Sequence, residues 1–408
     1  MSAVVLSVYK VANLSLGAGQ FWVYMQYAQG LRRLGCDVYW LEQVQPSGGD
    51  GPDEEARLCA TVLERMQLFG LERKTLLYVA DPGAVDGVRF IACTERHAKA
   101  VLRRADLLLN FHYAIDPRLL AWARRTAFVD IDPGLLQLWM STGQLAVARH
   151  DRYLTTGETV GTPEARFPDC GVRWTRIRPP VCLDLWPVAH NPQAEAFTTV
   201  SSWSSASWLK VKANGHSTLR DNTKRSAFLE YVDLPRQVAR PLELALYLLD
   251  RDPAGQARRK QAEQDAADRA RLERHGWRVR DSREVAGSPH AFRSYVQTSR
   301  GEFSCAKPSC VEFRNAWVSD RSVCYLASGK PIVVQDTGPS SYLPDGEGIF
   351  RFSSLPQAAE ALYAIESDYK RQCDAARALA ETYFDARHVI EHALNATLGR
   401  APVPRATT

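Results

Sequence analysis

Two polar clusters at the ends of apolar runs carry the side chains best suited to proton transfer. The first closes the run Leu107–Tyr113, where His112 follows an apolar strand pattern. An imidazole can take a proton from a hydroxyl group near neutral pH, which makes His112 a candidate catalytic residue. A single histidine is more often a satisfied core residue, and this alternative stays open.

The second cluster is Val129–Gly134, which contains Asp130 and Asp132. Alternate residues of a strand point to the same face, so we expect the two carboxylates to share one face. There they could act as a general base or orient the hydroxyl groups of an acceptor. An equally open alternative is a turn in which Asp132 stabilises the chain before Pro133.

A glycine-bearing loop, Gly17-Ala18-Gly19, follows the first apolar run and precedes a helical pattern. Its backbone N–H groups could bind a phosphate or a sugar at the helix N-terminus, or the loop could be an ordinary connector. A dinucleotide-binding fingerprint is not indicated. Trp22 occupies the place of its third glycine, and the loop is longer than the tight turn that the fingerprint needs.

The composition limits the classes of protein to which these residues can belong. With 408 residues, 45% hydrophobic and 24% charged, the chain is typical of globular proteins of two or three domains. A net charge of +5 does not indicate a dedicated nucleic-acid-binding protein. The nine cysteines form no Cys-x-x-Cys pair, and we find no secretory leader or apolar run of membrane-spanning length. We therefore expect a cytoplasmic protein without a zinc site, disulfide framework or transmembrane segment.

In the first half of the chain, short apolar runs alternate with helical patterns. A strand over residues 3–11, a helix over Gln20–Leu34 and a strand over Asp37–Glu42 form a βαβ unit. Further strands are predicted at Thr75–Val79, Leu107–Asn110, Ala127–Ile131 and Arg152–Thr155. This alternation predicts a parallel sheet flanked by helices.

The second half repeats the alternation after the proline-rich segment Val172–Asn191, which is predicted to be a linker. Its strands are expected at Phe197–Val200, Leu242–Leu249, Trp277–Arg280, Tyr295–Thr298, Pro331–Val334 and Ile349–Phe352. We therefore predict an α/β protein with two Rossmann-like domains, residues 1–185 and 193–385, facing each other across a ligand-binding cleft. A C-terminal helix over 386–400 could pack back on the first domain, and the tail 401–408 is expected to be disordered. The charged segment Ala254–His275 alternates in sign and predicts a solvated, ion-paired surface helix.

The most informative segment begins with Gly301-Glu302-Phe303-Ser304 and continues from Ser319 to Gly338. It combines a capped helix, a Gly329-Lys330-Pro331 turn and a buried strand. This segment resembles the donor-binding half of a GT-B glycosyltransferase, in which an acidic-aromatic loop precedes a helix ending in Ala-Ser-Gly-x-Pro. The resemblance is most specific over residues 295–350, and the two-domain layout extends it loosely to the whole chain.

In such enzymes a nucleotide-diphosphate sugar is the co-substrate and no metal or other cofactor is required, because helix-end N–H groups and basic side chains stabilise the leaving diphosphate. Carried over by position, the resemblance implies that Glu302 and Phe303 face the sugar. The phosphates would face the start of the helix, which comprises Ser319, Asp320, Arg321 and Ser322. Cys324 departs from the pattern, since retaining members usually have there a glutamate that holds the ribose.

The segment Phe197–Trp203, followed by Thr223-Lys224-Arg225, also resembles GT-B proteins, in which the second domain opens with such a strand. The resemblance implies that Lys224 contacts the diphosphate, with Arg225 as the alternate, while a solvated surface position remains the other interpretation. Asp336 and His290 are further candidates for contacts to sugar hydroxyl groups.

Together these features predict a metal-independent glycosyltransferase that moves a sugar from a nucleotide donor to a hydroxyl or amine group of a small-molecule, glycan or other acceptor. Three alternatives remain, because a fold does not fix a function. They are a nucleotide-sugar 2-epimerase, a binding module that has lost catalysis, and a glycosyltransferase acting on modified nucleic acid.

Overall fold

The computed structural model describes residues 2–14, 16–46, 51–81, 83, 87–204, 208–213, 216–249 and 256–399. The chain divides into two compact units. The first comprises Met1–Pro163, Phe167–Cys182 and Phe384–Thr408, and the second comprises Glu164–Arg166 and Leu183–Tyr383. The tail expected at 401–408, and the end of the C-terminal helix expected at residue 400, lie outside the described residues.

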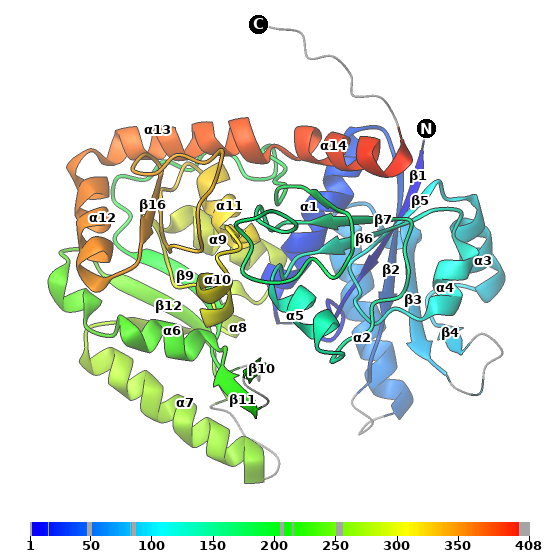
Figure 1. The fold of residues 1–408 in the computed structure, drawn as a ribbon, viewed down its shortest axis with the longest axis horizontal. Coiled ribbons are helices and arrows are strands. Elements are labelled where there is room, and N and C mark those ends of the chain that lie inside the picture. Colours follow the sequence, from blue (N-terminus) through cyan, green and yellow to red (C-terminus); the bar gives the residue numbers. More distant parts are fainter. Residues whose placement is uncertain are drawn as a thin grey trace, which may run out of the picture. The chain divides into compact units, whose positions relative to one another are not determined.

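The first unit contains an eight-stranded sheet with the order β4-β3-β2-β1-β5-β6-β7-β8 (Figure 1). All neighbouring strands are parallel except β3 and β4, which pair antiparallel. The strands are β1 Ala3–Val8, β2 Asp37–Gln43, β3 Thr75–Ala80, β4 Val88–Phe90, β5 Leu107–Asn110, β6 Thr126–Asp130, β7 Arg152–Thr155 and β8 Trp174–Arg176. The helices are α1 Ala18–Arg33, α2 Gly51–Gln67, η1 Glu72–Lys74, α3 Glu95–Arg104, α4 Pro117–Trp122, α5 Leu135–Ser141 and α14 Ala386–Leu398.

The second unit contains a six-stranded parallel sheet with the order β13-β12-β9-β14-β15-β16. Its strands are β9 Phe197–Ser202, β12 Leu242–Tyr247, β13 Arg278–Asp281, β14 Gly301–Ser304, β15 Ile332–Gln335 and β16 Ile349–Phe352. A separate antiparallel pair consists of β10 Trp208–Ala213 and β11 His216–Asp221. The helices are α6 Lys224–Glu230, η2 Leu234–Gln237, α7 Gln256–Arg274, α8 Ser282–Ala286, α9 Pro289–Thr298, α10 Pro308–Phe313, α11 Asp320–Ala327, α12 Leu355–Ser367, α13 Tyr369–Leu379 and the π-helical turn η3 Ala380–Phe384.

In each sheet the strand order reverses next to the strand that comes first in the sequence. In the first unit β1 lies between β2 and β5, and in the second unit β9 lies between β12 and β14. This is the doubly wound, Rossmann-like topology, in which ligands bind beyond the carboxyl ends of the strands at the point of reversal. The topology therefore marks one candidate binding edge in each unit.

The inner strands of both sheets are largely buried because helices cover the two faces of a parallel sheet. Leu107, Leu108 and Leu109 of β5 are almost completely buried in succession. In the second unit an aromatic cluster forms the centre of the core, with the rings of Phe303 and Phe352 stacked 5.2 Å apart. These continuous apolar runs are the signal that made the strands detectable in the sequence.

The C-terminal helix α14 packs against α1 within the first unit, and the two helices lie side by side in Figure 1. A glycine on α1, Gly30, permits the close approach. A Cβ atom at this position would lie 2.2 Å from Cδ1 of Ile390 and 3.0 Å from Cβ of Ala386. The absence of a side chain at Gly30 thus allows the last helix to complete the first unit.

The strand predicted at Tyr295–Thr298 is wrong, because these residues end helix α9. Ser288 caps this helix by accepting a hydrogen bond from the backbone N–H of Ala291, and Pro289 occupies the first turn, where proline is favourable. Phe292 and Val296, four residues apart, form its buried face. The strand lies instead at Gly301–Ser304.

One titratable residue of the second unit, Lys330, is buried although its ammonium group is normally charged. Lys330 is completely buried, and its ammonium nitrogen has no hydrogen-bond partner among the described residues. Burial lowers the pKa of Lys330 to about 8. Folding therefore requires either burial of a charge or release of a proton.

We expect Lys330→Met to stabilise the protein by about 1–3 kcal/mol at neutral pH, because an apolar chain of similar length removes this penalty. The unfolded state binds more protons than the folded state between the folded pKa of about 8 and the ordinary value of 10.5. Stability of the wild type should accordingly rise with pH across this interval, and that of the variant should not show this rise. Urea unfolding at several pH values measures both effects, and a less stable variant would contradict the assignment.

Candidate functional site

At the point of strand reversal in the first unit, two rings lie beyond the carboxyl ends of the adjacent strands β1 and β5. The rings of Tyr9 and His112 stack with their centroids 4.5 Å apart. His112 is only 3% exposed, and its Nδ1 is buried without a hydrogen-bond partner among the described residues. Burial, and secondarily Lys10, lower the pKa of His112 to about 4. The imidazole is therefore neutral near pH 7 and can accept or donate one hydrogen bond.

The backbone around His112 is fixed by Asn110, the last residue of β5. The Asn110 side chain accepts a hydrogen bond from the His112 backbone N–H at 3.0 Å and donates one to the His112 carbonyl oxygen at 3.0 Å. The Asn110 side-chain nitrogen also lies 3.1 Å from Nε2 of His150. Sequence reasoning did not assign Asn110, Tyr9 or His150 to this site, although an asparagine at a strand end is a recognisable turn signal.

The two aspartates after β6 have different environments. Asp130 is fully buried, and its carboxylate accepts hydrogen bonds from the Gln137 and Thr155 side chains at 2.8 Å each and from the Asp132 backbone N–H at 2.9 Å. Burial raises the pKa of Asp130 to about 7, against the opposing effect of these hydrogen bonds. The geometry therefore gives Asp130 a structural role in ordering this turn, whereas the prediction was that it acts as a general base or orients acceptor hydroxyl groups.

Asp132 is partly exposed and accepts a hydrogen bond from the hydroxyl group of Tyr113 at 3.1 Å. Tyr113 directly follows His112, so this bond joins the segments that follow β5 and β6. Of the two carboxylates predicted for the site, Asp132 is the one with access to a ligand.

The glycine loop is closed by its own hydrogen bonds. The Gly17 N–H donates to the Leu14 carbonyl oxygen at 2.7 Å, so this N–H is not directed at a ligand. Gly19 lies in the first turn of α1. Glu42, which is buried at the end of β2, accepts a hydrogen bond from the Ala12 backbone N–H and one from the Trp40 side chain, and burial raises the pKa of Glu42 to about 7. The interaction with Ala12 fixes the loop to the sheet.

In the second unit, Arg321 connects helix α11 to the two strands at the point of reversal. Its guanidinium group donates to Glu302 on β14 at 2.7 Å, to the hydroxyl group of Ser304 at 2.6 Å and to the Val200 carbonyl oxygen on β9 at 2.9 Å. Glu302 is completely buried. Arg321 is thus largely neutralised, and its main effect is to hold the start of α11 at the carboxyl edge.

A small cavity of about 30 Å³ lies at this edge. Its lining includes Ser319, Arg321 and Ser322 from the start of α11, Lys224 from α6 and Arg351 from β16. None of the described residues that line it is acidic. A cavity of this volume holds about one water molecule, so it could admit phosphate oxygens but not a whole nucleotide.

Two basic side chains, Lys224 and Arg351, line the cavity together with the start of α11. Lys224 is 8% exposed, and its ammonium group donates to the Cys305 carbonyl oxygen. Burial, and secondarily the Arg321 charge, lower the pKa of Lys224 to about 7. Arg351 donates to the Pro344 carbonyl oxygen at 3.0 Å, whereas its Nη2 is buried without a partner among the described residues. Sequence reasoning missed Arg351, although an arginine inside the apolar strand Ile349–Phe352 is an unusual residue.

Arg225, the predicted alternate to Lys224, is directed elsewhere. Its guanidinium group pairs with Asp268 on α7, which is almost completely buried. Asp265, also on α7, accepts hydrogen bonds from the Ser204 hydroxyl group at 2.8 Å and the Leu249 backbone N–H at 2.9 Å. The predicted solvated, ion-paired surface helix does have an ion pair here, which attaches α7 to α6, but its carboxylates Asp265 and Asp268 are buried rather than solvated.

Two further predicted residues, Phe303 and Asp336, do not line the cavity. Phe303 is 1% exposed and belongs to the aromatic core, because it points to the opposite face of β14 from its neighbours Glu302 and Ser304. Its predicted contact with the sugar is therefore wrong. Asp336 accepts a hydrogen bond from the Gly338 backbone N–H at 2.9 Å and so shapes the turn after β15. Cys324 is buried on α11.

The remaining predicted residues stay without an assigned ligand. His290, on α9, lines a different, open cavity. Asp320 occupies the first turn of α11, where its negative charge interacts favourably with the helix dipole. Among the described residues, no group of three or more His, Cys, Asp and Glu side chains is placed to hold a metal ion. No helix in the described part of the chain combines the length and hydropathy needed to cross a membrane.

Comparison with known proteins defines the fold. No protein-family profile and no curated sequence matches the chain. Its structure is similar to that of HepE from Anabaena in complex with UDP and glucose, with a TM-score of 0.56, 12% identity, and coverage of 97% of this chain and 99% of that one. An α-glucosyltransferase in complex with UDP and a 13-mer DNA gives a TM-score of 0.59, 9% identity, and coverage of 97% and 100%.

A third similar structure is a glycosyltransferase involved in avilamycin A biosynthesis, with a TM-score of 0.55, 14% identity, and coverage of 98% of this chain and 99% of that one. The chain therefore has the GT-B fold, and the predicted fold class is confirmed.

The bridge between Arg321 and Glu302 gives a test of this architecture. Arg321→Met should destabilise the protein by about 3–5 kcal/mol, because it leaves the buried Glu302 carboxylate without its cation. Adding Glu302→Gln should recover part of the loss. Urea unfolding of the two variants measures this difference.

A matched control is Arg371→Met, which removes an arginine paired with Glu347 where both side chains are more than half exposed. Its expected cost is below about 1 kcal/mol. Equal costs for Arg321→Met and Arg371→Met would show that Arg321 does not hold α11 in place.

Proposed function

We propose that the protein is a glycosyltransferase that moves a sugar from a nucleoside diphosphate donor to a hydroxyl or amine group of an acceptor. The observation that carries this proposal is the convergence of Lys224, Arg351 and the start of α11 on a cavity without acidic lining residues, at the reversal point of a GT-B sheet. The UDP bound in the similar structures supports a nucleotide donor.

The second unit would bind the diphosphate. Backbone N–H groups at the start of α11 carry the partial positive charge of a helix N-terminus, which favours phosphate. Lys224 and Arg351 would add charge-assisted hydrogen bonds to the phosphate oxygens. The same groups would stabilise the negative charge that develops on the leaving diphosphate, and this stabilisation is the proposed source of catalysis without a metal ion.

The first unit would serve the acceptor and the transferred sugar. Asp132 is the stronger candidate for the general base, since its carboxylate is partly exposed. An imidazole with a pKa as low as that of His112 is a weak base near neutral pH. A neutral His112 ring could instead accept a hydrogen bond from a sugar or acceptor hydroxyl group.

Substitution of the two predicted residues should separate binding from turnover. Lys224→Ala should weaken UDP binding by about 10-fold to 100-fold, because one charge-assisted hydrogen bond is lost. His112→Ala should keep UDP binding and lower turnover by at least about 10-fold. Calorimetric titration with UDP, and UDP release from a panel of UDP-sugars and acceptors, measure the two quantities.

The control is Lys370→Ala, which removes an exposed lysine paired with Asp374 on α13. It should change neither quantity. Release of UDP only by water, with no glycosylated product across a broad acceptor panel, would reject transfer. Full activity in both Lys224→Ala and His112→Ala would remove the two residue assignments.

The pKa of Lys224 predicts a specific pH dependence of donor binding. In the free protein this pKa is about 7, and the negative charge of a bound diphosphate must raise it. Above pH 7 binding is thus accompanied by proton uptake, and affinity should fall by up to about tenfold per pH unit until the pKa of the complex is reached. Below pH 7 Lys224 is already charged, so its contribution is constant.

A UDP-sugar is the suitable ligand for this measurement, because its phosphate diester groups do not titrate near neutral pH. Titration calorimetry in two buffers of different ionisation enthalpy counts the protons taken up. In Lys224→Gln the uptake should disappear. Equal proton uptake by this variant and the wild type would assign the dependence to another group.

A further inference from the structure

The second unit contains another cavity, at the opposite edge of its sheet from the one beside α11. It has a volume of about 360 Å³, which is within the range of about 300–1,000 Å³ for small-molecule sites. Phe197 opens β9, and Arg240 lies just before β12, so this cavity adjoins the amino ends of the strands. Across the length of β9 the two edges are about 17 Å apart. The two cavities are therefore separate.

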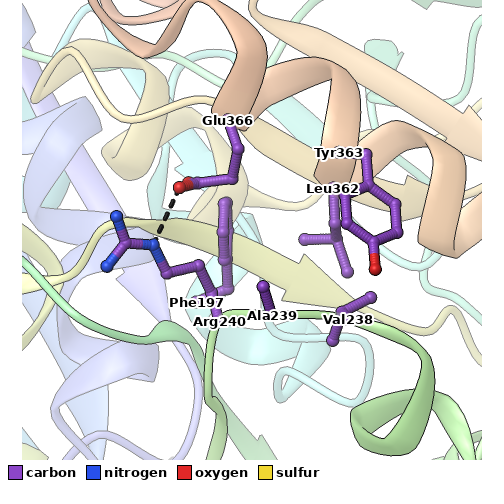
Figure 2. A pocket seen from close by; sticks show the side chains of 7 residues that line it. All are labelled: Phe197, Val238, Ala239, Arg240, Leu362, Tyr363 and Glu366. Atoms are coloured by element: carbon purple, nitrogen blue, oxygen red, sulfur yellow. Dashed lines mark hydrogen bonds and ion pairs between the residues drawn. The ribbon is translucent and has the colours of Figure 1, made fainter.

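Most of the cavity wall is apolar. Leu362 and Tyr363 come from α12, and Val238 and Ala239 come from the segment between η2 and β12 (Figure 2). The hydroxyl group of Tyr363 donates to the Gln237 carbonyl oxygen at 3.0 Å. This bond joins α12 to the segment before β12, so the wall is held at both sides.

Arg240 and Glu366 supply the polar end of the cavity, and Figure 2 shows Nε of Arg240 directed at the Glu366 carboxylate. The distance between Nε of Arg240 and Oε2 of Glu366 is 2.8 Å. The same carboxylate is already paired with both Nε and Nη2 of Arg300, whose side chain is 4% exposed. Two guanidinium groups thus share one carboxylate, and this end of the cavity carries a surplus positive charge.

The two arginines differ in what remains available for a ligand. Arg300 also donates to the carbonyl oxygens of Pro192 and Ala194 at 3.1 and 3.2 Å, so it is engaged on all sides. Arg240 uses only Nε in a hydrogen bond to a described residue, and its side chain is 41% exposed. Its two terminal nitrogens donate to no described residue and are available to a ligand.

We propose that this cavity is a binding site for a small amphipathic carboxylate. The apolar part of the ligand lies against Leu362, Val238 and Ala239, and its carboxylate binds the terminal nitrogens of Arg240. A guanidinium group matches the geometry of a carboxylate, and the ligand's negative charge compensates the surplus positive charge. An amine of the same length would be repelled. The proposal is independent of the proposed sugar transfer, because the two cavities share no lining residue.

Titration calorimetry with octanoate, octanol and octylamine below their aggregation concentrations tests the proposal, since the three probes differ mainly in their head groups. We expect octanoate to bind at least about tenfold more tightly than octanol, and octylamine not to bind. Arg240→Met should weaken octanoate by about tenfold or more and leave octanol unchanged. Ala239→Phe should fill the cavity and abolish binding of octanoate.

The control variant is Arg236→Met, which removes an exposed arginine on η2 that pairs with Asp233 and does not line the cavity. Its octanoate affinity should equal that of the wild type. Urea unfolding of every variant verifies that the fold is kept. Equal binding of all three probes, or octanoate binding that survives both Arg240→Met and Ala239→Phe in folded protein, would overturn the proposal.

Discussion

When the strand order of a parallel sheet reverses, the connections that leave the two adjacent strands run to opposite faces of the sheet. Both connections are right-handed, so the carboxyl ends between them stay uncovered by either helix. The chain meets this constraint twice, at β1 and β5 and at β9 and β14. His112 and Tyr9 follow the first pair, and Ser304 and the Arg321 contacts belong to the second. In each unit the topology therefore determines where the residues of the candidate site lie.

Burial then determines which polar groups at these edges remain available. Asp130 and Arg321 are surrounded by protein partners that satisfy them, and they shape the edge. Asp132, Lys224 and Arg351 retain access or an unused donor. Residue type alone does not separate these two groups, because both contain carboxylates and cations. The distinction arises from the number of hydrogen-bond partners that the fold brings to each side chain.

Much of the fold could be predicted from the sequence because buried parallel strands are short apolar runs. The predicted and observed strands coincide at Leu107–Asn110 and Arg152–Thr155. The prediction failed at Tyr295–Thr298, where a short apolar pattern fitted a helix equally well until its cap was considered. Local patterns thus identified the elements best where burial was continuous over a whole strand.

The site was less predictable because its geometry depends on distant partners. Lys224 and Arg225 are adjacent, yet only the structure shows that Arg225 pairs with Asp268, 43 residues away. Phe303 was predicted to face the sugar from its position in a motif, whereas strand alternation directs it to the core. An aromatic residue flanked by two polar ones on a buried strand is itself a signal for this orientation. No comparable signal indicates that Arg351 lies near Lys224.

The second unit has surplus positive charge at both edges of its sheet, and this charge affects the stability of the folded protein. A partly buried cation whose charge is not fully compensated by an internal counterion lowers the stability of the folded protein, because its desolvation is only partly offset. Lys224 is such a cation, since burial lowers its pKa to about 7. An anionic ligand offsets this cost when it binds, so binding also stabilises the folded protein. Lys330 is the contrasting case, because it is completely buried but lines neither cavity. Burial of a cation alone therefore does not indicate anion binding. In the second unit the indication comes from cations that also line a cavity.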